Sequence, residues 1–319
     1  MNSRPRIWLA SLTFAAMAAV PTMASASSNG NNGSKSEIIR KHSLDNLNSV
    51  KARNARDAKT GGARTVSGNG IDYHNGKVIL GTTNVYVIWY GSWPDTTGTS
   101  STPVILTDLL TNIGGSPYFN INTSYYSVSN SAKSFVTNSV HYGGATTDNY
   151  SRGTNLTDGN ITTIVSDAIT TNRLPKDTNG VYFVLTSSDV FETSGFLTQY
   201  CGWHTNATIA SADIKFSFVG DPARNYAACA PQTTSPNGNT SADAMASVIA
   251  HELEETVSDP DLNAWYDSRG YENADKCAWN FGTTATLNGA KSNMTLGSRK
   301  FLIQQNWLNA NGGSCKLSY

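Results

Sequence analysis

Residues 240–260 read TSADAMASVIAHELEETVSDP, and this stretch is the part of the chain around which the fold is built. Its apolar residues recur at helical spacing, and Pro260 cannot continue a helix, so the pattern predicts a helix that ends near Ser258. Thr240 and Asp243 have the spacing of a capping box, in which a hydroxyl and an acid close the first turn. The sequence therefore favours one long helix from Thr240 to Ser258.

One face of this predicted helix carries His251, Glu252 and Glu255. His251 and Glu255 are one turn apart and point the same way, and Glu252 lies about 100° round the same helix. An imidazole and a carboxylate can bind a metal ion, and a free carboxylate beside them can move a proton. Glu254 points elsewhere, and we expect it to be solvated. The alternative is a surface helix with solvated acids and a lone histidine, although the Ala/Val/Ile-rich surroundings indicate a buried element.

A metal centre on this helix needs a further ligand from another part of the chain. The candidate carboxylates downstream are Asp259, Asp267, Glu272 and Asp275. Glu272 follows Glu255 at a distance that lets the chain turn and return, so we expect it to bind the metal. Asp275 is placed to hold His251 through its other ring nitrogen. The predicted metal site thus comprises His251, Glu255, Glu272 and Asp275.

Zinc is the expected ion, and calcium is the less favoured one. Residues 267–272 have some features of a calcium loop, but Arg269 stands where an oxygen ligand is expected. With zinc in place, Glu252 is the candidate general base that takes a proton from water and passes it to a leaving amine. His204 is a candidate for stabilising a developing oxyanion. The alternative for His204 is a buried, hydrogen-bonded histidine beside a disulfide.

The rest of the chain predicts an α/β or α+β fold, a mixed sheet packed with helices. Runs rich in β-branched and aromatic residues indicate strands, and one almost continuous apolar run indicates a buried central strand. The expected strands are residues 78–83, 85–90, 180–186 and 214–219, with irregular strands between 116 and 150. One expected helix starts at Ser101 and ends at Gly114, and a second lies within residues 155–171.

Composition divides the chain into three parts. Residues 1–26 have the positive start, apolar run and small-residue cleavage site of a signal peptide, which predicts a secreted protein. Residues 27–70 are polar and predict either a disordered linker or a pro-segment that covers the site. We expect residues 71–319 to form a single domain without a membrane anchor. Basic and acidic residues balance at 23 each, which argues against a nucleic-acid-binding protein.

The chain contains four cysteines, an even number typical of disulfide bonding in exported proteins. Four cysteines allow three pairings. We favour Cys201 with Cys229 and Cys277 with Cys315, because each pair then closes a local segment. Zinc binding by these cysteines is the alternative, but no Cys-x-x-Cys spacing supports it.

Several blocks of the chain resemble one known family. They are residues 85–93 (VYVIWYGSW), 181–190 (VYFVLTSSDV), 201–204 (CGWH), 263–266 (NAWY) and 299–302 (RKFL). Over residues 76–319 the chain resembles a bacterial member of the exordium / phosphate-induced protein 1 family. That resemblance implies export and a shared fold, since family members are secreted or cell-wall proteins linked to growth and nutrient supply. It implies no particular reaction.

The order His-Glu-x-x-Glu from His251 to Glu255 is also similar to gluzincin peptidases such as thermolysin, which implies a zincin-like metallohydrolase core. Glu255 stands where those enzymes have a second histidine.

The sequence leaves two hypotheses for the function of this protein. The first is a secreted zinc hydrolase, a peptidase acting on a peptide or another extracellular polymer. The second is a non-catalytic binding protein for cell-wall sugar or a signalling partner, indicated by aromatic residues that include Trp89, Trp93 and Trp203, with Trp265 further along.

Overall fold

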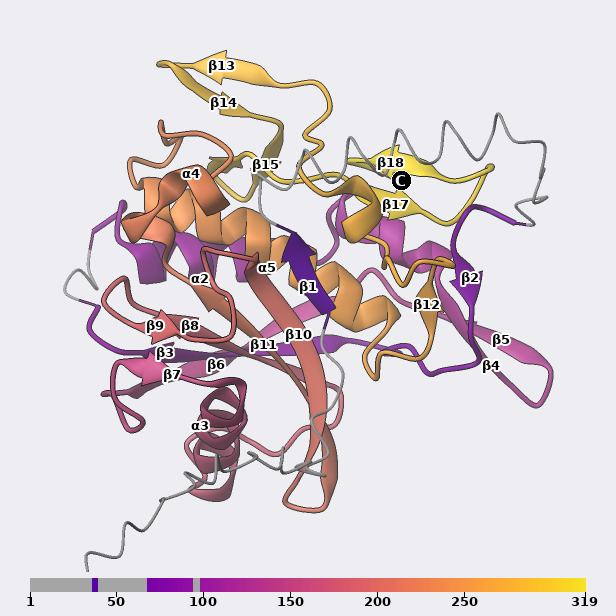
Figure 1. Cartoon of the computed structure of the whole chain (residues 1–319). Helices are drawn as coiled ribbons and strands as arrows, with labels where there is room; N and C mark the ends of the chain where they lie inside the picture. Colours follow the sequence, from indigo (N-terminus) through magenta and orange to yellow (C-terminus); the bar gives the residue numbers. More distant parts are fainter. Residues whose placement is uncertain (1–35, 40–67, 94–97) are drawn as a thin grey trace, which may run out of the picture. The chain divides into compact units, whose positions relative to one another are not determined.

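The computed structural model describes residues 36–39, 68–93 and 98–319, and all of them belong to one compact unit that spans residues 33–319 (Figure 1). The predicted signal peptide, residues 1–26, lies outside the described residues. Most of the predicted linker or pro-segment, residues 27–70, lies outside them as well. The exceptions are residues 68–70 and a short strand at residues 36–39, which joins the main sheet.

A six-stranded mixed sheet forms the centre of the described structure, with strand order β1-β10-β11-β8-β3-β6. The strands are β1 (Ser36–Ile39), β3 (Thr83–Tyr90), β6 (Val140–Asp148), β8 (Gly180–Thr186), β10 (Tyr200–Ile209) and β11 (Ala212–Gly220). β11, β8, β3 and β6 pair in parallel, whereas β10 and β1 pair antiparallel to their neighbours. The expected mixed sheet with packed helices is therefore confirmed.

Burial explains which strands could be predicted from the sequence. Every residue of β8 is buried, as expected for a continuous apolar run inside a parallel sheet covered on both faces. The strands predicted at 85–90, 180–186 and 214–219 are confirmed. The strand predicted at residues 78–83 is wrong except for Thr83, because Val78 and Ile79 form a buried loop. The backbone N–H of Ile79 donates to the carbonyl of Val257 instead of to a neighbouring strand.

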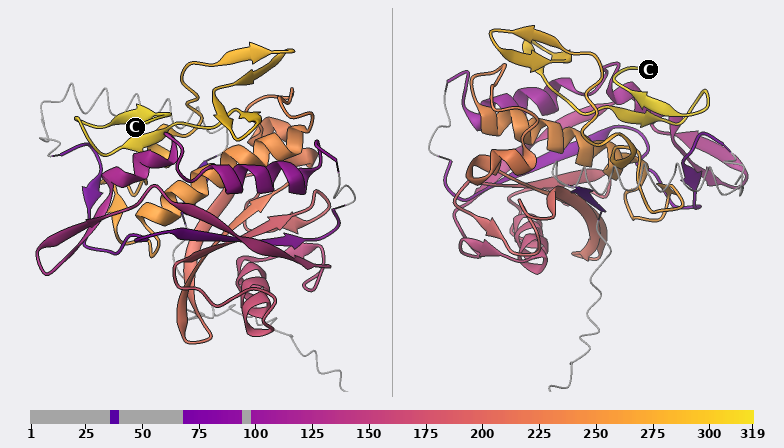
Figure 2. Two further views of the ribbon diagram at one scale, coloured as in Figure 1. Left: turned by 180° about the vertical axis from the view of Figure 1, so that it is seen from behind. Right: turned by 45° about the horizontal axis from the view of Figure 1, so that its top comes forward.

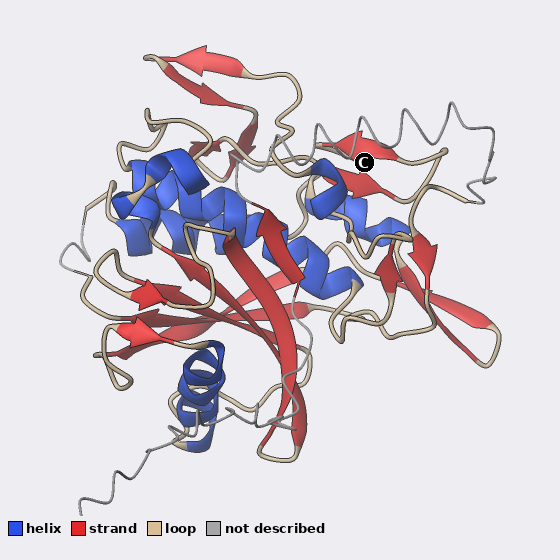
Figure 3. Ribbon diagram, viewed as in Figure 1, coloured by secondary structure: helices blue, strands red, loops and turns tan. Residues whose placement is uncertain are grey.

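Helices cover both faces of the sheet, with α2 and α5 on one face and α3 on the other (Figures 1 and 3). The helices are α2 (Thr102–Asn112), α3 (Asp158–Thr170), the short α4 (Tyr226–Cys229) and α5 (Thr240–Ser258), with 3-10 turns η2 (Phe119–Ser124), η3 (Pro222–Arg224) and η4 (Asp275–Cys277). α2 and α3 were predicted. Their caps follow the local sequence, since Ser101 accepts from the Val104 N–H and Thr157 forms a capping box with Asn160.

The long helix α5 ends at Ser258 as predicted, but its first turn is closed differently. Asn239 is the N-cap, and its side-chain oxygen accepts a hydrogen bond from the Ala242 N–H. The predicted capping box of Thr240 and Asp243 is absent, because the Asp243 carboxylate accepts from the preceding loop at Asn237 instead. Every residue from Ser241 to Ser258 is buried, so α5 has no solvated face.

Small two-stranded elements surround this core. They are β2 (Asp72–Tyr73) with β12 (Trp265–Tyr266), β4 (Tyr126–Ser129) with β5 (Ala132–Phe135), β7 (Asn155–Leu156) with β9 (Phe191–Glu192), β13 (Ala285–Leu287) with β14 (Ala290–Ser292), β15 (Met294–Leu296) with β16 (Arg299–Phe301), and β17 (Asn306–Leu308) with β18 (Ser314–Lys316). The C-terminal hairpins lie on the side of α5 that faces away from the sheet (Figure 2). They bury the helix face that would otherwise be exposed.

Both disulfide pairings favoured from the sequence are confirmed. Cys201 on β10 is bonded to Cys229 on α4, and Cys277 at the end of η4 is bonded to Cys315 on β18. The described residues contain no free cysteine.

Candidate metal centre

Four separate segments bring two histidines and four carboxylates together. Helix α5 carries His251, Glu252 and Glu255, strand β10 carries His204, the loop after β12 carries Glu272, and η4 begins with Asp275. All six side chains are buried or nearly so. We call them the acidic cluster.

One half of the acidic cluster is centred on His251. Its Nε2 atom lies 2.9 Å from Oε1 of Glu255 and 3.6 Å from Oδ1 of Asp275. The backbone N–H of Asp275 donates to the same Glu255 oxygen over 2.9 Å, which holds η4 against α5. Ligand atoms of these three residues all lie within 4.8 Å of one another. Tetrahedral zinc places neighbouring ligand atoms roughly 3.3 Å apart, so the spacing fits such an ion.

The other half is centred on His204. Its Nδ1 atom lies 3.4 Å from Oε2 of Glu252 and 3.7 Å from Oε2 of Glu255. Its Nε2 atom lies 3.5 Å from Oε1 of Glu272. Glu255 therefore lies between the two histidines, with one oxygen toward His251 and the other toward His204.

This arrangement differs from the roles expected of the two downstream acids. Glu272 was expected beside His251 as a ligand, with Asp275 one shell further out. In the structure Asp275 is the acid next to His251, whereas Glu272 lies next to His204. His204 was expected to stabilise an oxyanion or to be a buried histidine beside a disulfide. Its place among the carboxylates of the acidic cluster was missed, because the strand that carries it was not predicted.

The calcium-loop interpretation of residues 267–272 does not fit. Asp267 accepts hydrogen bonds from the backbone N–H groups of Arg269 and Tyr271. Its other oxygen lies 3.3 Å from Nζ of Lys276 and 3.1 Å from the Arg269 guanidinium. The carboxylate that would start the loop is thus already neutralised by cations of the chain itself.

The pKa values of the two histidines are shifted in opposite directions. Burial lowers the pKa of His204 to about 3, so its contacts with carboxylates are those of a neutral imidazole and not ion pairs. Burial alone would also lower the pKa of His251, but the carboxylates of Glu255 and Asp275 outweigh it and raise the pKa well above its ordinary value. Burial, with the neighbouring Asp275 carboxylate, raises the pKa of Glu255 to about 7.

The acidic cluster holds more acidic groups than histidines. Four carboxyl groups surround two rings, and only the ring of His251 has a raised pKa. Neither ring nitrogen of His251, nor Oδ1 of Asp275, makes a hydrogen bond of good geometry to any described residue, although all three atoms are buried. Buried polar atoms in this state are costly and call for an explanation such as a bound ion.

Glu254 was expected to be solvated, and that prediction is wrong. Its side chain is fully buried, and the amide of Asn306 on β17 donates to it. Burial raises the pKa of Glu254 well above its usual range, which favours the neutral form of this acid. The burial of Glu254 could not be predicted from the helix alone, because the C-terminal hairpins cover the helix face on which it lies.

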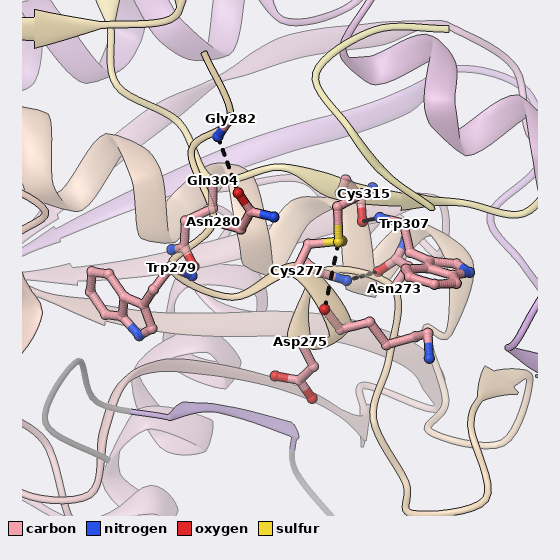
Figure 4. The surroundings of a disulfide bond; sticks show 12 residues. Asn273, Asp275, Cys277, Trp279, Asn280, Gly282, Gln304, Trp307 and Cys315 are labelled. Atoms are coloured by element: carbon pink, nitrogen blue, oxygen red, sulfur yellow. Dashed lines mark hydrogen bonds between the residues drawn. A yellow bond between two sulfur atoms is a disulfide. The ribbon is translucent and has the colours of Figure 1, made fainter. Parts of the chain in front are cut away.

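Asn273 and a disulfide position Asp275. The Asn273 amide donates to the carbonyl of Glu254 on α5, and the Asn273 carbonyl accepts from the Trp307 N–H. η4 then ends at Cys277, whose disulfide to Cys315 ties it to the C-terminal hairpin (Figure 4). The two ends of the short segment that carries Asp275 are therefore both held.

Gly202 sets the distance between β10 and α5. A Cβ atom at this position would lie 2.6 Å from Cγ1 of Val248 and 3.0 Å from Oε1 of Glu252. Only glycine permits so close an approach without a shift of the helix or the strand. The contact brings Glu252 next to the strand that carries His204.

Fold and site together define a mixed α/β protein with a buried cluster of histidines and carboxylates between a long helix and the sheet. The chain belongs to the phosphate-induced protein 1 family, whose conserved-region model matches residues 71–316. It is 30% identical over 275 residues to Protein EXORDIUM-like 3 of Arabidopsis thaliana, covering 74% of this chain and 80% of that protein. It is 31% identical over 287 residues to Protein EXORDIUM-like 5 of the same plant, covering 77% of each.

A further relative is Protein PHOSPHATE-INDUCED 1 of Nicotiana tabacum, 27% identical over 225 residues and covering 61% of this chain and 67% of that protein. None of these names specifies a chemical reaction. No solved structure matches the chain, and the expected zincin-like core stays a prediction. The two disulfides are consistent with a secreted or extracellular protein. Among the described residues, every helix is too short or too polar to span a bilayer.

Proposed function

We propose that this protein is an extracellular zinc-dependent hydrolase that acts on polypeptides. The observation that carries the proposal is the acidic cluster, in which four carboxyl groups and two histidine rings meet in the protein interior. A divalent cation would offset the negative charge of the carboxylates that bind it. A nitrogen ligand beside oxygen ligands favours zinc over calcium or magnesium, which take oxygen ligands.

His251, Glu255 and Asp275 are the residues that would hold the ion. Their ligand atoms come together around Nε2 of His251, which lies 2.9 Å from Glu255 and 3.6 Å from Asp275. Three protein ligands with a position left for water is the usual composition of a catalytic zinc site. Zinc in such a site acts as a Lewis acid that makes water a nucleophile near neutral pH.

Glu252 is the residue proposed to accept the proton of that water. It lies on α5 next to His251, one helical position away, and it is not a member of the His251 ligand group. Its Oε2 atom lies 3.4 Å from Nδ1 of His204. Because burial keeps the His204 ring neutral, this ring can donate one hydrogen bond and orient either Glu252 or a substrate carbonyl.

A second candidate function rests on the complete burial of the centre. His204, His251, Glu252 and Glu255 are each 0% exposed. Structural zinc sites are closed whereas catalytic ones keep an open position, so the same ion could support a non-catalytic binding protein. Stacking of sugars on family tryptophans gives this candidate little support, since Trp89, Trp203 and Trp265 are buried in the core.

Two measurements on the protein secreted into culture medium separate these functions. Elemental analysis of the purified protein should give one zinc per chain, and no bound metal would overturn both forms of the zinc proposal. A peptide-library cleavage screen should then compare wild type with Glu252→Gln and with Asp243→Asn, which changes a buried acid on α5 outside the acidic cluster.

We expect Glu252→Gln to keep its zinc and its melting temperature and to lose cleavage by about 10²–10⁴-fold, the usual contribution of a general base. Asp243→Asn should cleave as wild type does after correction for stability. Zinc-loaded wild type without any cleavage would move the conclusion to the binding protein. Cleavage by Glu252→Gln at the wild-type rate would reject the role of this residue.

A further inference from the structure

A strand from the N-terminal leader pairs with the strand that carries His204. β1 runs antiparallel to β10, and it lies beside β10 near α5 in Figure 1. The paired positions are Ser36 with His204, Glu37 with Trp203, and Ile39 with Tyr200, with an irregularity between Glu37 and Ile39. A segment far from the core in sequence thus lies at the edge of the sheet beside the acidic cluster.

The edge of β10 is suited to receiving an extended chain. Its other edge is taken by β11, so without β1 a row of backbone N–H and C=O groups would remain unpaired there. Such an edge is a template for an added strand. β1 covers only the part of β10 from Tyr200 to His204, and these residues are buried, whereas Asn206 to Thr208 are less so. The covered part is the one that adjoins the acidic cluster.

We propose that this edge of β10 is a binding site for extended polypeptide, filled in this chain by residues 36–39 of its own leader. Residues directly opposite each other in an antiparallel pair share one face of the sheet. A chain bound in this register therefore has one residue opposite His204, whose ring faces Glu252 and Glu272. The substrate would be bound mainly through its backbone, with little demand on its side chains.

The leader strand then has a regulatory consequence, which rests on the proposed function. While residues 36–39 occupy the edge, a substrate polypeptide cannot pair there. β1 has four residues and an irregular register, so it forms few ladder hydrogen bonds and can be displaced or removed.

Hydrogen exchange on the full exported chain tests the docking of β1. Proline at Glu37 and Ile39 removes two backbone donors from β1. The matched control is Ala52→Pro, in the leader but outside β1. In the double variant, the amides of β10 that face β1 should exchange at least about tenfold faster, as expected when local protection is lost. Amides of β11 should not change, and the control should resemble wild type.

A peptide added in trans tests whether the freed edge binds polypeptide. A fluorescent peptide with the sequence of residues 33–42 should bind the double variant and not wild type. Ile39→Pro alone serves if the double variant fails to fold. The docking proposal is overturned if β10 exchanges equally in all variants, or if the peptide binds none of them although β10 is deprotected.

The same measurements in His251→Ala separate this proposal from the proposed function. Exchange and peptide binding depend on the edge of β10 and not on zinc, so we expect them to survive the loss of the metal. A double variant at Glu37 and Ile39 that contains zinc and docks the peptide but cleaves no peptide would reject the hydrolase and leave the polypeptide-binding edge intact. Cleavage that is unaffected by opening β1 would reject only the blocking role of the leader.

Discussion

Nε2 of His251 and Oε1 of Glu255 lie 2.9 Å apart on successive turns of α5. The same Glu255 oxygen accepts the backbone N–H of Asp275, so one carboxylate joins the helix to η4. Because its other oxygen faces His204, any change at Glu255 reaches both histidines. The predictions below follow from this central position and from the segments that maintain it.

Asp275→Asn should weaken zinc binding more than Glu272→Gln does. Asp275 lies beside His251 and belongs to the group that would hold the ion, whereas Glu272 contacts His204. We expect a loss of about 10–100-fold for Glu272→Gln, typical of a residue that orients a ligand. The loss for Asp275→Asn should be larger. Competition titrations with a fluorescent zinc chelator measure both, and the reverse order would show that Glu272 is the ligand.

Zinc affinity should rise with pH, most steeply below about pH 7. Burial and the Asp275 carboxylate raise the pKa of Glu255 to about 7, and only its deprotonated form binds a metal. The pKa of His251 is raised well above its ordinary value, so protons compete with the ion for this ring as well. Competition by protons at both residues therefore weakens as the pH rises. Chelator titrations across the range measure this, and a flat profile would contradict it.

Loss of the Cys277–Cys315 disulfide should reduce zinc affinity as well as stability. Replacing both cysteines with serine frees the end of η4 two residues after Asp275. Removing a native disulfide usually costs about 2–5 kcal/mol of folding free energy. The comparison is the double serine variant at Cys201 and Cys229, which leaves η4 tied to β18. We expect both double variants to lose a similar free energy of unfolding. The variant at Cys277 and Cys315 should lose more zinc affinity.

Gly202→Ala should destabilise the fold and disturb Glu252. The added methyl group would lie 2.6 Å from Val248, and relief requires α5 and β10 to move apart. Overpacking of this kind costs about 1–3 kcal/mol. Gly159→Ala in α3 is the control, since nothing lies closer than 3.7 Å to its new Cβ and the helix gains a better former. Urea unfolding compares the two, and equal stability would show that the Gly202 contact is relaxed.

The sequence predicted the parts of the fold that depend on neighbouring residues. β8 and most of β3 are continuous apolar runs, and such runs are visible without knowledge of their partners. β10 was missed because its sequence, YCGWHTNATI, mixes polar and apolar residues, and both kinds are buried from Tyr200 to Thr205. The strand expected at residues 78–82 rested on the apolar run from Val78 to Leu80, and a short run of this kind is found in loops as well as in strands.

Within the candidate site, the sequence alone determined the helix and the spacing of His251, Glu252 and Glu255, because residues one turn apart on a helix are neighbours in any fold. Only the tertiary structure decided which groups meet them. His204 arrives through the pairing of β10 with its neighbours. Asp275, instead of Glu272, faces His251 because its N–H bonds to Glu255 on α5 and a disulfide ties η4 to β18. Such contacts depend on the path of the whole chain between distant residues, and no local pattern records that path.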